Sequence, residues 1–315
     1  MILTKQRDTY VDVAKGIAML LIIRIHAEVF GVIHAPYPII AVPFFFFMSG
    51  FYDNTNKPFK EWFSKAFKSL VLTGVIWVLI SFAYLSFLHY IKDRTIPINF
   101  TIENPLIGGG VTWFLYALFY AKCGMGAIRR SKLPFYIVFP ILFIVASLST
   151  KNLPLLLDEG LAALPFYYLG FILYPYINRT RGGHVVLVIL GIICIMLMPM
   201  DWFPFLVVPW VVDGRIFMYP VYFIMILLSF FPILWISNKL AKVTWLANFG
   251  KQTLGILVLH PLMLHTCAVL LNRVLIPSSV TWIVVFLFAY IAVGIASYYC
   301  TLLIITYWPI LLGKN

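Results

Sequence analysis

Charged side chains are scarce in this chain of 315 residues: Asp, Glu, Lys and Arg make up 11% of it, whereas hydrophobic residues make up 63%. The mean hydropathy is +0.98. Soluble globular domains carry about 25% charged residues, so this composition excludes that class. The long apolar runs predict an all-α integral membrane protein.

Cysteine is also rare, and the sequence contains no C-x-x-C pair. This excludes a disulfide framework and a zinc site, so we expect free thiols and no bound metal. The four cysteines are Cys123, Cys194, Cys267 and Cys300. Two signatures of soluble enzymes are missing as well. Residues 108–110 (GGG) are not followed by Gly-Lys-Ser/Thr and form no phosphate-binding loop, and Ser49 lacks the G-x-S-x-G elbow of serine hydrolases.

The net charge of +12 is not gathered into a basic tract interleaved with aromatic residues, so we expect no nucleic-acid partner. Of the 23 Lys and Arg residues, 15 fall in alternate loops on the side of the N-terminus and five fall on the other side. The positive-inside rule then places both termini in the cytoplasm and requires an even number of spans. We expect a multi-pass protein of the cytoplasmic (inner) cell membrane.

Ten apolar runs are candidate membrane spans, and they leave little of the chain over. They cover about 11–33, 38–52, 67–91, 111–128, 133–149, 159–177, 185–200, 215–237, 252–271 and 280–308. Residues 202–212 are also apolar but contain two prolines, which predicts a re-entrant or surface segment. We expect residues 1–315 to form one membrane domain with no appended soluble domain.

The first run carries five ionisable side chains, and charge inside a bilayer usually faces the protein interior and marks function. They are Asp12, Lys15, Arg24, His26 and Glu28. Lys15 and His26 are eleven residues apart, which places them within about 20° on one helix face and about 16 Å apart along it. This favours a lined pathway over a packing seam. Arg24 and Glu28 fall on the opposite face, where we expect a structural ion pair.

Four segments carry further patterns of glycine and polar residues. Residues 12–16 read DVAKG and are followed by His26, residues 43–51 read PFFFFMSGF, residues 110–115 read GVTWFL, and residues 248–261 read NFGKQTLGILVLHP. In this order and spacing they resemble the membrane-bound acyltransferase 3 family over about residues 8–265. Lys15 stands where Arg is commoner, and Thr253 and Leu257 stand where relatives usually have Ser and Tyr. The Lys-Gly variant is most similar to the fucose 4-O-acetylase-like subgroup.

The resemblance implies ten transmembrane helices and transfer of an acyl group, usually acetyl from acetyl-CoA, to a hydroxyl of a carbohydrate or glycolipid. Acetyl-CoA would be a co-substrate, with no permanently bound cofactor. The expected partners are the acyl donor, a carbohydrate or lipid-linked sugar acceptor and the bilayer. Many relatives also carry an extracytoplasmic esterase-like domain. Because we find none here, we expect transfer to be completed within the membrane domain or by a separate protein.

The resemblance and the helix geometry together assign roles to individual residues. His26 is the expected general base or transient acyl acceptor, and Lys15 and Asp12 are expected to bind the acyl donor. The residues expected to line the substrate site are Ser49, Trp113, Thr253 and His260. Simpler structural roles stay open: a snorkelling Lys15, a hydrogen-bonded core His26, a capping Ser49 and an interfacial Trp113.

The role of the basic residues in the loops is also left open by the sequence. Lys57, Lys60, Lys65, Lys68, Arg129 and Arg130 could assist the donor, although topology and attraction to anionic lipid would explain each one alone. At the level of the whole protein, the alternative is a transporter or flippase of a lipid-linked sugar or acyl group. Transporters often show internal repeats with paired broken helices, which this sequence lacks. A sensor or scaffold would not need Lys15 and His26 on one face.

Overall fold

The computed structural model describes residues 8–28, 40–93, 110–148, 153–180, 184–198, 218–274 and 280–314, and every regular element in these ranges is a helix. The α-helices are α1 (Thr9–Glu28), α2 (Ala41–Gly50), α3 (Phe59–Ala66), α4 (Thr73–Asp93), α5 (Trp113–Ser131), α6 (Phe135–Leu148), α7 (Leu157–Thr180), α8 (Val185–Leu197), α9 (Met218–Lys239), α10 (Thr244–Lys251), α11 (Thr253–Val274) and α12 (Val280–Tyr307). A π-helical turn, η2 (Phe67–Leu72), joins α3 to α4. Short 3₁₀ turns are η3 (Gly110–Thr112), η4 (Pro154–Leu156) and η5 (Pro309–Leu312).

The prediction of an all-helical membrane protein is confirmed in this part of the chain, and a helix occurs at each of the ten apolar runs. By length and composition, five described helical stretches can cross a membrane: Phe59–Leu88, Leu157–Thr180, Pro220–Lys239, Thr253–Leu271 and Phe288–Tyr307. The count of ten spans stays a prediction. The segment 202–212 lies outside the described residues. The structure adds α3 and α10, two short helices outside the apolar runs.

The core is built around α2, whose phenylalanines are buried between α1, α7 and α9. Phe44 and Phe47 both contact Phe230 of α9, with ring centroids 5.2 and 5.0 Å apart. A helix that is hydrophobic all round is a buried helix. Its ten residues rise about 15 Å, roughly half of the hydrocarbon thickness of a bilayer. The phenylalanine run is therefore a packing element.

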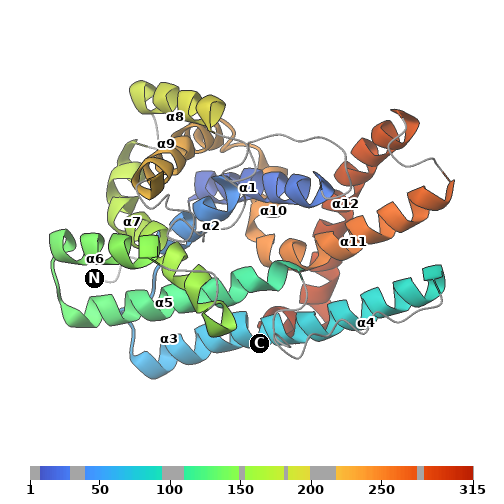
Figure 1. The fold of residues 1–315 in the computed structure, drawn as a ribbon, viewed down its shortest axis with the longest axis horizontal. Coiled ribbons are helices and arrows are strands. Elements are labelled where there is room, and N and C mark those ends of the chain that lie inside the picture. The colour runs from blue at the N-terminus through green and yellow to red at the C-terminus, as the bar shows by residue number, and fades with distance from the viewer. Residues whose placement is uncertain are drawn as a thin grey trace.

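Glycines let two pairs of helices approach at backbone distance. A Cβ atom on Gly170 of α7 would lie 1.9 Å from the carbonyl oxygen of Phe47, and one on Gly50 would lie 2.1 Å from that of Tyr167. Small residues of this kind are typical of close helix contacts in membranes. The α1–α10 contact (Figure 1) is of the same type, because a Cβ atom on Gly250 would lie 1.8 Å from the carbonyl oxygen of Asp12. These contacts hold α2 and α10 against their neighbours.

We predict that Gly170→Ala destabilises the protein by about 1–3 kcal/mol, the usual cost of overpacking, because backbone rather than a flexible side chain opposes the new methyl group. Thermal unfolding in detergent, followed by size-exclusion fluorescence, measures the change. Gly294→Ala is the matched control, since its nearest atom would be Ile23 Cδ1 at 3.7 Å. Equal melting temperatures for the two variants would contradict the close contact of α2 and α7.

Candidate functional site

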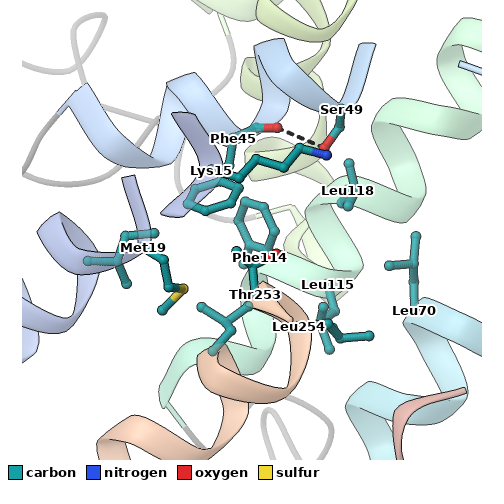
Figure 2. A pocket seen from close by; sticks show the side chains of 12 residues that line it. Lys15, Met19, Phe45, Ser49, Leu70, Phe114, Leu115, Leu118, Thr253 and Leu254 are labelled. Carbon is teal, nitrogen blue, oxygen red and sulfur yellow. Dashed lines mark hydrogen bonds between the residues drawn. The ribbon is translucent and has the colours of Figure 1, made fainter. Parts of the chain in front are cut away.

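Helices α1, α2, α5 and α11, with η2, enclose a cavity of about 160 Å³ (Figure 2). Three side chains with polar heads line it, one each from α1, α2 and α11; they are Lys15, Ser49 and Thr253. The remaining walls are apolar and consist of Met19, Ile22, Phe45, Leu70, Phe114, Leu115, Leu118, Leu254 and Leu257. Three of the residues that the sequence predicted for the site are thus brought together.

Lys15 crosses one end of this cavity. Figure 2 shows its side chain extending from α1 toward the end of α2 that carries Ser49. The Lys15 ammonium lies 5.4 Å from the centre of the Tyr52 ring, within reach of a cation–π interaction. The Ser49 hydroxyl donates a 2.7 Å hydrogen bond to the carbonyl oxygen of Phe45 one turn earlier. The Ser49 hydroxyl proton is therefore engaged within the helix, and the two lone pairs of its oxygen can accept hydrogen bonds.

His26 and His260 meet between α1 and α11. His26 Nδ1 lies 3.3 Å from His260 Nε2, and the ring centroids are 4.8 Å apart with the planes at 79°. His260 is fully buried, whereas His26 is half-buried. The sequence predicted that His260 lines the substrate site, which stays a prediction. The structure places His260 in direct contact with His26, the predicted catalytic residue.

Both histidines also lie within hydrogen-bond distance of carbonyl oxygens of their own helices. His260 Nδ1 lies 2.9 Å from the carbonyl oxygen of Ile256, and His26 Nδ1 lies 3.0 Å from that of Ile22. A carbonyl oxygen only accepts, so the arrangement that satisfies both carbonyl oxygens has the hydrogen of each neutral ring on Nδ1. The single Nδ1–H of His26 is then shared between the carbonyl oxygen of Ile22 and the lone pair of His260 Nε2. In that arrangement His26 Nε2 also carries a lone pair.

The histidine pair lies one helical turn beyond the cavity, on the same two helices. Ile22 lies one turn before His26 on α1, and Leu257 lies one turn before His260 on α11; both line the cavity wall. Lys15 lies at the other end of the same face of α1. Along α1, the arrangement places a lysine, a cavity and a histidine pair in that order.

The other predicted residues lie outside the lining of this cavity. Asp12 is buried in α1, with its carbonyl oxygen close to Gly250. Trp113 begins α5 and contacts Phe114, whose own ring reaches the cavity. Arg24 is half-buried, and the Glu28 side chain lies outside the described residues, so the predicted ion pair stays a prediction. Among the described residues no group of three or more His, Cys, Asp or Glu could hold a metal ion.

Sequence reasoning missed Asp53, which organises the polar network after α2. Its fully buried carboxylate accepts hydrogen bonds from Arg129, Tyr167 and Thr55, at 3.0, 3.0 and 2.8 Å. The partners come from α5, from α7 and from the turn after α2, so sequence separation hid them. The network uses the charge of Arg129 to hold helix ends together.

Comparison with known proteins agrees with this architecture. A family model described as an acyltransferase domain matches residues 8–302. No curated protein and no solved structure matches the chain. The match covers nearly the whole sequence, including all the residues of the cavity and both histidines. This chain therefore belongs to the acyltransferase 3 family of membrane acyltransferases.

Proposed function

We propose that this protein transfers an acetyl or other short acyl group from acetyl-CoA to a hydroxyl of a carbohydrate or glycolipid, as in the fucose 4-O-acetylase-like subgroup. The observation that carries the proposal is the hydrogen-bonded pair of His26 and His260 one turn beyond a cavity that begins at Lys15. Acyl transfer to a hydroxyl requires a base and a place for the thioester, and this arrangement supplies both.

In the proposed reaction, His26 Nε2 removes the proton of the acceptor hydroxyl while its oxygen attacks the thioester carbonyl carbon. The new C–O bond forms, the C–S bond breaks, and the proton on His26 passes to the departing thiolate of CoA. While His26 is an imidazolium, its Nδ1–H donates to the lone pair of His260 Nε2. A hydrogen on His260 Nε2 would instead face the Nδ1–H of His26. The pair therefore favours placing the extra proton on His26.

A second route through the same atoms is a transient acyl-histidine. The lone pair of His26 Nε2 would attack the thioester carbonyl carbon and expel CoA as a thiolate. The acceptor oxygen would then attack the acyl carbon, the N–C bond would break, and the hydroxyl proton would pass to the thiolate. Either route needs the thioester near His26. The cavity holds about 160 Å³, less than the roughly 300–1,000 Å³ of typical small-molecule sites. It suits the thin pantetheine arm of the donor, and we propose that the acceptor reaches His26 from another side.

The proposal includes the predicted topology of ten spans with both termini in the cytoplasm of an inner-membrane protein, so that Lys15 lies near the cytoplasmic surface. Single cysteines at Lys65 and Glu103, in a background without the four native cysteines, are predicted to react with membrane-impermeant maleimide from opposite sides of the membrane. Fluorescence of the labelled bands in intact cells and inverted vesicles measures this. Labelling of both positions from the same side would contradict the topology.

We predict that Lys15→Ala raises the apparent dissociation constant for acetyl-CoA about tenfold or more, because a lost charge–phosphate contact costs about 1.5–3 kcal/mol. Binding of radiolabelled acetyl-CoA to purified protein measures the effect. Lys15→Arg is expected to retain affinity better than Lys15→Gln, since the interaction depends on positive charge. Unchanged donor binding by Lys15→Ala at normal expression would remove Lys15 from the donor site.

We predict that His26→Ala lowers acyl transfer by at least about 10²–10⁴-fold while the donor still binds, because general base help is worth that much in rate. His260→Leu should lower kcat on the order of tenfold without changing donor affinity, since the partner of His26 Nδ1–H is lost. Transfer of radiolabelled acetyl to the acceptor fraction of membranes provides the rate.

His265→Leu is the matched control, because His265 follows His260 by five residues on α11 and so lies about 140° around that helix from it. Its activity should match that of wild type. Rapid quenching of wild type with labelled donor alone separates the two routes: label on the protein indicates an acyl-histidine, and its absence indicates direct transfer. Near-normal acyl transfer by His26→Ala would rule out both routes through His26.

A further inference from the structure

A second hollow, of about 970 Å³, lies along α3, η2 and the residues after η5. We call it the lysine groove. Four lysines line it, together with one carboxylate and one hydroxyl; they are Lys60, Lys65, Lys68, Lys314, Glu61 and Ser64. It is much larger than the cavity beside Lys15 and, unlike it, is dominated by cations.

Packing of α3 and of the C-terminal residues fixes the two walls of the lysine groove. On α3, Trp62 and Ala66 are buried, which leaves the lysines on the outer face. On the other wall, Trp77 Nε1 donates a 2.7 Å hydrogen bond to the carbonyl oxygen of Leu311. Gly313 has φ of +61°, and a Cβ atom there would lie 2.5 Å from Ser69 Cα of η2. This close approach places Lys314 beside the lysines of α3 and η2.

Three other basic residues near the groove interact with groups of this chain. Lys57 pairs with Glu61, which balances the one acidic group of the groove. Arg129 is bound to Asp53. Arg130 donates to the carbonyl oxygen of Gly126 and lies over the Phe59 and Trp62 rings. The groove therefore keeps a net positive charge from exposed lysines.

The groove also adjoins the cavity of the candidate site. Both border η2, which presents Lys68 to the groove and Leu70 to the cavity. On α5, Leu118 lines the cavity, and Lys122 lies one turn later on the same helix. The groove and the cavity thus share one border at η2. Single π-helical turns such as η2 frequently occur at functional sites.

We propose that the lysine groove binds the phosphorylated adenosine of coenzyme A, while the diphosphate linkage reaches Lys15 and the pantetheine arm extends into the cavity toward His26. This assignment rests on the proposed function, because it takes the donor to be a CoA thioester. Lysine binds phosphate as a point charge, and the volume of the groove suits a nucleotide. The phosphate of an anionic lipid headgroup has the same chemistry. The position of the groove next to the cavity favours the nucleotide.

The test compares K65E/K68E with K239E/K242E, a control that makes the same charge change at exposed lysines outside the groove. Both proteins are placed in nanodiscs of zwitterionic phosphatidylcholine, and binding of 3′,5′-ADP, CoA and pantetheine is measured by calorimetry. We expect K65E/K68E to lose about tenfold or more in affinity for 3′,5′-ADP and CoA, with pantetheine binding unchanged. The control should match wild type for all three ligands.

Equal 3′,5′-ADP affinity in wild type and K65E/K68E, or no binding to wild type, would overturn the proposal. Nanodiscs containing phosphatidylglycerol provide the lipid arm. If K65E/K68E changes only the retention of phosphatidylglycerol and leaves 3′,5′-ADP binding intact, the groove is a lipid site and the proposal is wrong. Because 3′,5′-ADP carries no acyl group, this readout is independent of turnover. A protein that binds it through the groove yet transfers no acetyl group would contradict only the proposed function.

Discussion

The backbone contact between Gly16 of α1 and Gly250 of α10 is the constraint on which the site depends. Ten residues separate Gly16 from His26, and ten residues separate Gly250 from His260. At about 1.5 Å per residue, His26 lies about 15 Å from that contact along α1. His260 lies on α11, beyond the break at Gln252 that separates α10 from α11. Because α11 also packs against α1, the two rings meet at 3.3 Å. A side chain at either glycine would force α1 and α10 apart.

The packing of α2 against its neighbours holds the cavity wall in place. This matters because the residues that line the cavity come from distant parts of the sequence. The aromatic packing of α2 against α9 and the glycine contact of α2 with α7 hold Phe45 and Ser49 in the cavity wall. The Asp53 network then ties the end of this short helix to α5 and α7. Aromatic rings with few rotatable bonds lose little entropy when they pack. The cavity can therefore stay narrow without depending on the mobile ends of long side chains.

The sequence predicted the features that depend on local patterns. Apolar runs identified the positions of ten helices, and the spacing of Lys15 and His26 identified the face of α1 that Met19 and Ile22 now share with the cavity. The same reasoning could not find α3 and α10, because short amphipathic helices leave no long apolar run. Gly16 and Gly250 were visible in the motifs, but their contact was not.

Contacts between distant segments were beyond sequence reasoning for a physical reason. The pairing of His26 with His260 and of Asp53 with Tyr167 depends on how helices cross, which no periodicity within one helix encodes. His260 was selected only through a motif, and its partner could not be named. Thr253, two turns before His260 on the same face, was the one local hint that α11 presents a polar stripe to the cavity.

The sequence separation within the histidine pair has a consequence for biogenesis. His260 is synthesised 234 residues after His26. At about 5–20 residues per second, translation needs roughly 10–50 s to cover that distance. During this interval α1 carries an imidazole whose final partner does not yet exist. The nascent chain must accommodate this polar group until α11 arrives. The site is thus among the last parts of the protein to form.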